Sequence, residues 1–399
     1  MCTDPRRSFS AAERFNKSGN VSGFGLPAIS FNVFSSIELS LYAQDKVFSQ
    51  PGKFDLYFVA NWIIFHLTRK GKQKKENERT FMTAIKQAYE IAVIGELNVD
   101  LVASGLKSEP KLGREIIADD FEITLGSASA IFASGISRLG RSVTFVSQVG
   151  NDEFGRFCMD TLAGKGISTD NISISNKSKT GVTVVLSTPK DRALVTYLGA
   201  IAELSLKDIR LDILDAHRHL HLTSYYLQTA LQPDFAGLIR AAKAKKLTTS
   251  FDPNSDPDQA RNDNVFEVIK ETDILFVNEP EAKLLTDQDD VHAACRSLGE
   301  LCPLVVVKLG ANGSIAYQNG KFEAAEGFKV NAVDTTGAGD SFAAGFVHAF
   351  LDGADLRRCL TVGNACGALS TLGAGGTTNQ PHRAKLDNFL GENSVSAKK

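Results

Sequence analysis

Residues 334–346 read DTTGAGDSFAAGF, and the fold assignment of this 399-residue chain rests on this stretch. Three residues with almost no side chain lie at its centre, Gly337, Ala338 and Gly339, so the backbone can turn sharply and direct successive N–H groups to one point. Phenylalanine then recurs every four residues, at positions 342, 346 and 350, which predicts a helix that begins near Asp340 and buries that face. The N–H groups and the positive end of the helix dipole together favour an anion, such as a phosphoryl group in transfer.

Asp340 stands where this helix is expected to begin. A carboxylate in that place can take the proton from an attacking hydroxyl group, as a base does in phosphoryl transfer. The alternative is that the glycines only permit close packing and that Asp340 only caps the helix, which would stabilise it by about 1 kcal/mol. The full thirteen-residue string favours the catalytic interpretation.

From Ile91 onward, short apolar runs alternate with longer helical patterns, which predicts an α/β fold with a mostly parallel central sheet and helices on both faces. Two stretches, at about 101–124 and 181–197, contain alternating β-type runs and would form a small separate sheet that we interpret as a lid. The expected strands are 91–94, 143–149, 219–222, 247–251, 274–277, 304–308 and 314–317, and the expected helices include 128–139, 233–245, 279–285 and 340–351.

The string at 334–346 and this order of elements resemble the ribokinase-like family of carbohydrate kinases, also called the PfkB family, over roughly residues 91–390. The resemblance implies a large α/β domain with a β-sheet lid, ATP with Mg²⁺, and in some members a K⁺ ion near the anion hole. It implies that Asp340 is the catalytic base and that Asp334 and Thr336 lie near the K⁺ ion. The anion hole would be Gly337, Ala338 and Gly339.

Further motifs follow in the family's order on the nucleotide side. Asn278 and Glu281 come after an apolar strand and resemble the element in which the acid holds magnesium-bound water. On its own, the same motif also suits the first turn of a helix. Lys308 is placed to reach a phosphate, although a lysine at a strand end is more often solvated. The resemblance assigns nucleotide contacts to Lys308, Gly310, Gly313 and Asn364, and a glycine-rich turn to residues 373–376.

On the sugar side, Asn98 and Asp100 resemble the family's substrate-binding NxD motif, in which the acid accepts hydrogen bonds from two hydroxyl groups. Asp252 and Asn254 end another strand and would lie at the same rim. The alternative for both motifs is ordinary turn chemistry, because Asn, Asp and Pro are favoured in turns.

The stretch LGSASAIFASGISRLG departs from the family's first signature, although Gly126 keeps its first glycine as a substrate contact. Ser127 replaces the second glycine, and Ile131 replaces an asparagine that binds a sugar hydroxyl. The less polar pocket leaves a nucleoside kinase of the same fold open as an alternative. Tyr225 and Tyr226 could stack on a base or on a sugar face. A nucleotide-binding sensor without catalysis is a third alternative, against which the intact Asp340 argues.

The composition of the chain limits the classes of molecule that we expect it to bind. A formal net charge of −2 and a pI near 6.4 give no basic footprint for nucleic acid, so we expect a small-molecule substrate. Six cysteines without a CxxC pair are typical of a reduced, cytoplasmic protein. We expect the histidines of AHRHLHL, at 217, 219 and 221, to be satisfied by hydrogen bonds rather than by a metal. An exposed edge of the lid would allow a homodimer.

Residues 1–90 differ from the rest, with 13 Lys and Arg against 8 Asp and Glu. Their most apolar run, residues 54–67, is too short to span a membrane. We interpret this part either as upstream sequence before Met82 or as a genuine N-terminal extension. Residues 391–399 are expected to be a flexible tail.

Overall fold

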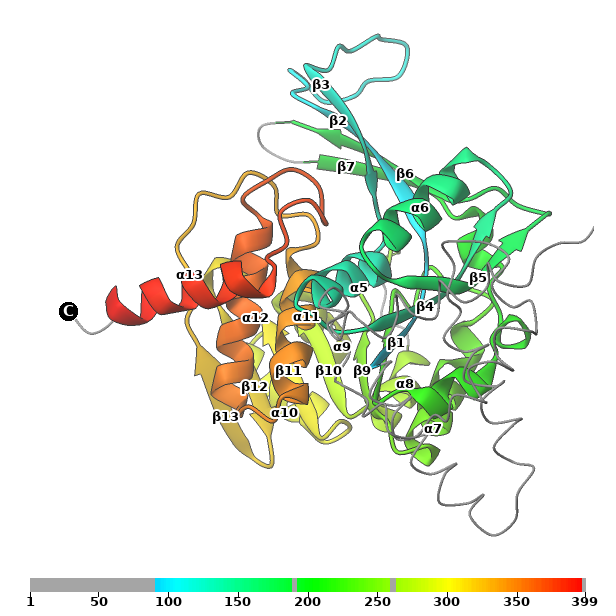
Figure 1. Cartoon of the computed structure of the whole chain (residues 1–399). Coiled ribbons are helices and arrows are strands. Elements are labelled where there is room, and N and C mark those ends of the chain that lie inside the picture. Colours follow the sequence, from blue (N-terminus) through cyan, green and yellow to red (C-terminus); the bar gives the residue numbers. More distant parts are fainter. Residues whose placement is uncertain (1–89, 189–191, 259–262, 397–399) are drawn as a thin grey trace, which may run out of the picture. The chain divides into compact units, whose positions relative to one another are not determined.

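A nine-stranded sheet forms the centre of the computed structural model, which describes residues 90–188, 192–258 and 263–396 (Figure 1). The strand order is β13-β12-β11-β10-β9-β8-β1-β4-β5, and all neighbours from β11 to β5 pair in parallel. The strands β12 and β13 add an antiparallel edge. The strands are β1 (Ile91–Ile94), β4 (Val143–Gly150), β5 (Ser168–Ser175), β8 (His219–Thr223), β9 (Thr248–Asp252), β10 (Ile274–Asn278), β11 (Leu304–Lys308), β12 (Ser314–Gln318) and β13 (Lys321–Ala325).

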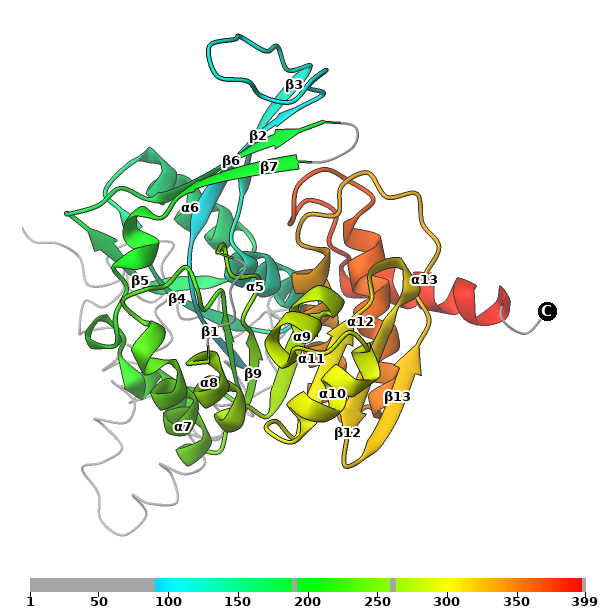
Figure 2. The ribbon, with the colours of Figure 1, turned by 180° about the vertical axis from the view of Figure 1, so that it is seen from behind.

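Helices cover both faces of this sheet, because its central strands are apolar on both sides. In β1, Ile91 and Val93 belong to one hydrophobic core, whereas Ala92 and Ile94 belong to the other. The first core contains α5 (Ala128–Arg138), α6 (Glu153–Gly164), α11 (Ala338–Leu351), α12 (Leu356–Ser370) and α13 (Arg383–Ser396). The second contains α7 (Phe235–Ala244), α8 (Val265–Glu271), α9 (Glu279–Thr286) and α10 (Val291–Gly299), which face the viewer in Figure 2. Short 3₁₀ helices lie at Gly199–Ala202, Leu206–Asp208, Leu211–Ala216, Gln232–Asp234 and Gly310–Asn312.

The predicted lid is a separate four-stranded sheet of order β3-β2-β6-β7. Its strands are β2 (Asn98–Ser104), β3 (Asp120–Leu125), β6 (Gly181–Ser187) and β7 (Arg192–Tyr197). The strand β2 follows β1 after three residues, and Figures 1 and 2 show the lid rising from this edge of the large sheet. The lid therefore begins at Asn98 rather than near residue 101, so the predicted sugar-binding motif belongs to the lid.

The two faces of the lid differ in polarity. One row across all four strands is apolar and consists of Ile123, Leu101, Val184 and Val195. The neighbouring row, on the opposite face, is polar and consists of Thr124, Asp100, Thr183 and Thr196. The apolar row includes two well-exposed side chains, Ile123 and Val195. A homodimer through this face stays a prediction.

Besides the start of the lid, the start of α11 and the predicted C-terminal tail differ from the predictions, and several other elements differ by one or two residues at an end. The helix α11 begins at Ala338 rather than at Asp340, because Gly337 adopts the left-handed conformation that ends the preceding loop. The helix α13 runs to Ser396, so residues 391–396 are helical where a tail was expected. The interpretations of residues 1–89, including the apolar run 54–67, lie outside the described residues. Among the residues that are described, no helix is both long and apolar enough to cross a membrane.

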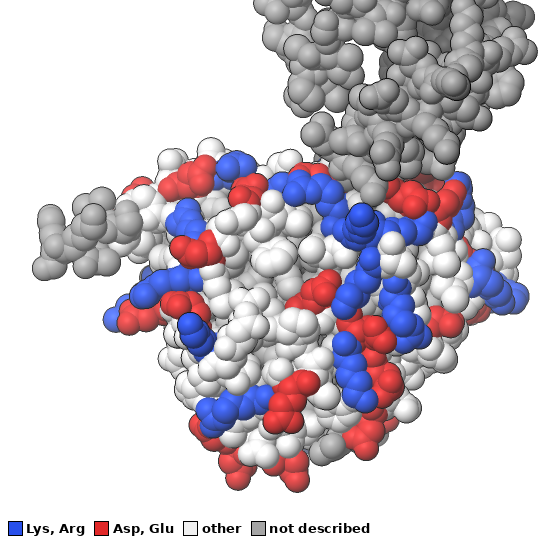
Figure 3. Space-filling model, turned by 90° about the horizontal axis from the view of Figure 1, so that it is seen from below, with Lys and Arg blue, Asp and Glu red and all other residues white. Residues whose placement is uncertain are grey.

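Charged side chains of both signs are interspersed on the face shown in Figure 3, with uncharged surface between them. This mixture agrees with the small formal net charge of −2.

Candidate active site

Three predicted site residues, Asp252, Asn278 and Lys308, are the last residues of β9, β10 and β11. Parallel strands bring their carboxyl ends to one edge of the sheet, which is where open α/β folds bind ligands. The N-terminus of α11 points to the same edge. Residues far apart in the chain, including Asp252 and Lys308, thereby become neighbours.

The two glycines at the start of α11, Gly337 and Gly339, lie in confined space. Gly337 has a φ angle of 69°, and a Cβ atom placed on it would lie 2.8 Å from Cγ2 of Ile131. A Cβ atom on Gly339 would lie 3.2 Å from Nζ of Lys308. The ammonium group of Lys308 therefore sits beside the predicted anion hole. Ile131 packs against Gly337 and Gly376, so it shapes this loop rather than only the sugar pocket.

Asp340 lies in the first turn of α11 and is partly accessible to solvent. Burial and, to a smaller extent, the neighbouring Asp252 raise the pKa of its carboxyl group to about 8, although Lys308 opposes this rise. Without ligands, the carboxyl group therefore holds its proton at neutral pH. A carboxyl group with a pKa near the working pH is suited to acid–base chemistry.

Lys308 and Asp252 form a buried ion pair at the floor of the site. Nζ of Lys308 donates to Oδ2 of Asp252 at 2.5 Å, and Asp252 is 1% exposed. Burial lowers the pKa of Lys308, but the carboxylates of Asp252 and Glu281 outweigh it and hold this pKa above its usual range. Lys308 is not the solvated lysine typical of a strand end. Asp252, predicted to bind substrate, is committed to Lys308 in this structure.

Asn278 and Glu281 form a reciprocal cap at the start of α9. Oδ1 of Asn278 accepts from the Glu281 amide, and Oε2 of Glu281 accepts from the Asn278 amide, each at 2.8 Å. The hydroxyl of Ser255 donates to the other Glu281 oxygen at 2.9 Å. Burial raises the pKa of Glu281, and Lys308 opposes that rise. The capping role that the sequence suggested as an alternative is present, and it fixes the carboxylate at the rim of the site.

Asn98 and Asp100 are joined to each other on the lid. Nδ2 of Asn98 donates to Oδ1 of Asp100 at 2.9 Å and to Oγ1 of Thr183 at 3.2 Å. A Cβ atom on Gly126 would lie only 2.1 Å from Oδ1 of Asp100, so this glycine makes room for the carboxylate. Burial raises the pKa of Asp100 to about 6.

Glu96 is a site residue that the sequence analysis missed. It is 3% exposed and lies between β1 and the lid strand β2. Ser129 and Ser224 donate to its two carboxylate oxygens at 2.5 and 2.7 Å, and Asn254 donates to Ser224 at 2.8 Å. Burial raises its pKa. The signal was present in the sequence, because Glu96 is an acid directly after a buried strand in VIGELNVD.

Ser127 takes the place of a glycine at the cost of an unusual backbone. Its φ angle is 75°, a value that side chains rarely adopt. Its hydroxyl donates to the Glu96 carbonyl at 2.6 Å and accepts from the Ala130 amide at 3.1 Å, which caps α5. These two hydrogen bonds offset the backbone strain and tie α5 to the base of the lid.

A cavity of about 420 Å³ brings the predicted nucleotide residues together. Asn364 donates to the carbonyls of Ala325 and Glu326 at 3.0 and 3.1 Å, which fixes the wall opposite α11. Among the residues that line this cavity are Lys308, Gly310, Gly313, Gly339 and Asn364.

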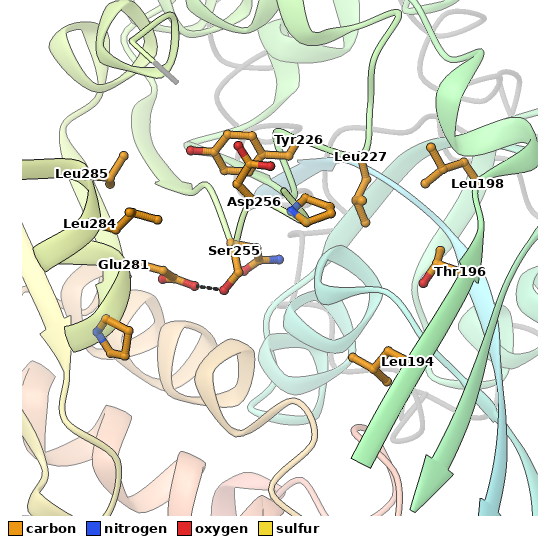
Figure 4. Close-up of a pocket in the computed structure, with 13 residues that line it drawn as sticks. Leu194, Thr196, Leu198, Tyr226, Leu227, Ser255, Asp256, Glu281, Leu284 and Leu285 are labelled. Carbon is orange, nitrogen blue, oxygen red and sulfur yellow. Dashed lines mark hydrogen bonds between the residues drawn. The ribbon is translucent and has the colours of Figure 1, made fainter. Parts of the chain in front are cut away.

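A second cavity, of about 1000 Å³, lies between the lid strand β7 and α9 (Figure 4). Leu194 and Thr196 line it from the lid, and Tyr226 and Leu284 line it from the body. Glu281 and Ser255 meet on its floor, and Asn254 is also part of the lining. Tyr225 is instead buried against Phe235 and Phe251, so of the two predicted stacking tyrosines only Tyr226 lines this cavity.

Asp334 and Thr336 form a hydrogen-bonded loop directly before the anion hole. Oδ1 of Asp334 accepts from the amide and the hydroxyl of Thr336 at 2.9 and 2.7 Å. Arg192 of the lid reaches this loop, with Nη1 2.9 Å from Oγ1 of Thr336. The lid is therefore in contact with the loop that the resemblance assigned to a cation.

The three histidines of β8 and its approach make hydrogen bonds, as expected. His217 contacts Thr144, and His219 and His221 share Ser250. Burial lowers the pKa of His219 to about 3. Within the described ranges, no group of three or more His, Cys, Asp or Glu residues is arranged to hold a metal ion.

The model of the pfkB family of carbohydrate kinases matches residues 88–383. The chain belongs to this family. As a member, it is a phosphotransferase that acts on alcohol groups. A ribokinase from Haemophilus influenzae is 30% identical over 308 residues, which cover 75% of this chain and 98% of that protein. A probable chloroplastic fructokinase-6 from Arabidopsis thaliana is 30% identical over 324 residues, covering 75% of this chain and 82% of that one.

Solved structures confirm the ribokinase-like fold. The structure of an Arabidopsis thaliana ribokinase complexed with ribose and ATP superposes with a TM-score of 0.67 and 25% identity. The match covers 76% of this pfkB-family chain and 98% of that ribokinase. The large sheet and the separate lid agree with this assignment.

Proposed function

We propose that this chain transfers the γ-phosphoryl group of ATP to a hydroxyl group of a sugar, with Asp340 as the general base. The observation that carries the proposal is the meeting of three parts: the N-terminus of α11 with its glycines, the carboxyl group of Asp340, and the polar row of the lid above them. A carboxylate beside an anion-binding helix terminus can accept the hydroxyl proton while the helix stabilises the transferred group.

In this mechanism, each group of residues has a separate task. Asn98 and Asp100 bind the sugar hydroxyls from the lid, where carboxylate and amide groups can pair with two hydroxyls at once. ATP occupies the cavity lined by Gly310, Gly313 and Asn364, and Lys308 faces its phosphates. When substrate and ATP fill the site, ionised Asp340 accepts the proton, and closure of the lid excludes water.

Magnesium fits the residues at the phosphate end of this site. Glu281 offers carboxylate oxygens, the ligands that Mg²⁺ prefers, whereas Asp252 is paired with Lys308. The Glu281 carboxylate is fixed by Asn278 and Ser255, so it is oriented before any ion arrives. We assign Glu281 to the water shell of Mg²⁺, which would neutralise phosphate charge. Lys308 supplies a second fixed positive charge from the protein itself.

The decisive experiment is ATP consumption by the full chain with Mg²⁺ across pentoses, hexoses, sugar acids and nucleosides. Turnover with a sugar supports the proposal. If ATP binds but none of the tested acceptors is phosphorylated, the proposal is contradicted.

A nucleoside acceptor is favoured by one observation, the apolar lining of the larger cavity. Leu194, Leu198 and Leu284 line this cavity together with Tyr226, and an aromatic base attached to a sugar could stack on this tyrosine (Figure 4). If the acceptor is a nucleoside, Tyr226→Ala should raise its KM with little change in kcat. An exposed lid residue such as Glu122, changed to Gln, serves as the control. If the KM for the nucleoside is the same in Tyr226→Ala as in the control variant, Tyr226 does not bind the base.

A further inference from the structure

Arg192, the first residue of the lid strand β7, extends toward the loop in front of α11. Its Nη1 atom lies 2.9 Å from Oγ1 of Thr336 and 3.7 Å from Oδ1 of Asp334. Alternate residues of a strand share a face, so Arg192 points to the same side of the lid as Leu194 and Thr196, which line the larger cavity. The lid thus places a guanidinium group against the loop that precedes the anion hole.

The carboxylate of Asp334 already accepts several hydrogen bonds. Oδ1 of Asp334 accepts from the amide and hydroxyl of Thr336, and Oδ2 accepts from the Gly375 amide at 2.9 Å. The neighbouring carbonyl of Thr371 accepts from the amides of Val333 and Asp334. A monovalent cation needs several oxygen atoms with free lone pairs and no positive charge beside it. The expected K⁺ ion does not fit these residues while Arg192 is in place.

Arg192 also acts electrostatically on a second acid, the substrate-side Asp100. Burial raises the pKa of Asp100 to about 6, and the positive charge of Arg192 opposes that rise, whereas Asp334 adds to it. Hydrogen bonds from Thr336 and Gly375 outweigh burial and hold the pKa of Asp334 below its usual range, with a further contribution from Arg192. Without Arg192, the repulsion between the carboxylates of Asp100 and Asp334 would lack this counter-charge.

We propose that Arg192, delivered by the closing lid, supplies the positive charge at the Asp334–Thr336 loop that the family resemblance assigns to a potassium ion. Catalysis by this chain is then independent of monovalent cations. Closure of the lid and completion of the anion-binding loop become a single event, since the same side chain belongs to both. Arg192 is a positioning residue in this scheme, because it acts on the loop and not on the reacting atoms.

The test compares the full chain with Arg192→Met and Arg192→Lys. Arg114→Met is the matched control, because Arg114 is an exposed arginine on the connection between β2 and β3. Turnover is measured with choline chloride or KCl at one ionic strength, so that screening is constant. Wild type and the control should have the same rate in both salts. Arg192→Met should lose about tenfold or more in choline chloride and recover in KCl or in low millimolar guanidinium chloride. Arg192→Lys should keep more activity than Arg192→Met.

A thermal measurement tests the inference without any substrate, and therefore without relying on the proposed function. The melting temperature of Arg192→Met should rise in KCl relative to choline chloride, and that of wild type should not. Activation or thermal stabilisation of wild type by K⁺ would overturn the proposal. Full activity of Arg192→Met in choline chloride would also overturn it. A loss of activity that neither K⁺ nor guanidinium restores would overturn it as well. If no acceptor is phosphorylated at all, the proposed function fails while the melting temperatures still decide this inference.

Discussion

Replacement of Asp340 by asparagine separates its catalytic role from its cost to stability. The amide has nearly the shape of the carboxyl group but cannot accept the hydroxyl proton. Turnover should fall by at least about a hundredfold, the scale of general-base catalysis. The dissociation constant for ATP should change little, because the glycine backbone and Lys308 remain. Steady-state rates and a fluorescence titration of ATP measure the two quantities, with exposed Asp289→Asn as the control.

The same variant should alter the pH dependence of stability in a defined direction. The pKa of Asp340 rises from 3.8 to about 8 on folding. When folding raises the pKa of a carboxyl group, the folded state is most stable at pH values below the pKa of the unfolded state. It loses stability as the pH rises from that value to the pKa of the folded state. The loss is about 1.4 kcal/mol per pH unit at most, and less for a partly accessible group.

Urea denaturation at pH 5 and pH 8 measures this difference. Wild type should lose stability relative to Asp340→Asn between these pH values, because only wild type must keep a proton on this carboxyl group. Undiminished turnover in the variant would refute the proposed mechanism. A difference in unfolding free energy that does not vary with pH would refute the burial argument.

Three further predictions concern the same site. Lys308→Met leaves the carboxylate of Asp252 buried and unpaired, so the free energy of unfolding measured by urea denaturation should fall by about 3–5 kcal/mol. The double variant Lys308→Met/Asp252→Asn should recover most of this loss. Equal stability of the single variant and wild type would contradict the pairing. Gly337→Ala should destabilise by about 1–2 kcal/mol through its positive φ angle, and by more through crowding. Gly353 also has a positive φ angle but lies in open space, so Gly353→Ala measures the backbone contribution alone. Equal losses of stability in Gly337→Ala and Gly353→Ala would argue against crowding at Gly337. The value of kcat/KM should rise with pH along a limb centred near 8 as the proposed base ionises, and a flat profile from pH 6 to 9 would count against that base.

Local patterns allowed much of the fold to be predicted. Apolar runs such as VVV in β11 can be buried only inside a covered parallel sheet, and the boundaries of β1 and β11 agree with the expectation to the residue. The period-2 runs predicted the lid strands because successive side chains of a strand point to opposite faces of a sheet. The starts of the lid at Asn98 and of α11 at Ala338 differed from the prediction because they depend on pairing with β6 and on the backbone of Gly337, which no local pattern specifies.

The candidate site was predictable in its parts but not in its contacts. Asp340, Asn98 and Asn364 could be named because their motifs are contiguous. Glu96 was missed because its importance comes from Ser129 and Ser224, which lie far from it in the sequence.

The sequence by itself determined the α/β class, the family and the anion-binding string 334–346, because each depends on residues close together in the chain. Only the tertiary structure decided that Lys308 pairs with Asp252, across 56 positions, and that Arg192 reaches Thr336, across 144. Those contacts depend on strand order and on the position of the lid over the sheet. The physical reason is that charge interactions act through space, and neighbours in space are set by the packing of whole elements.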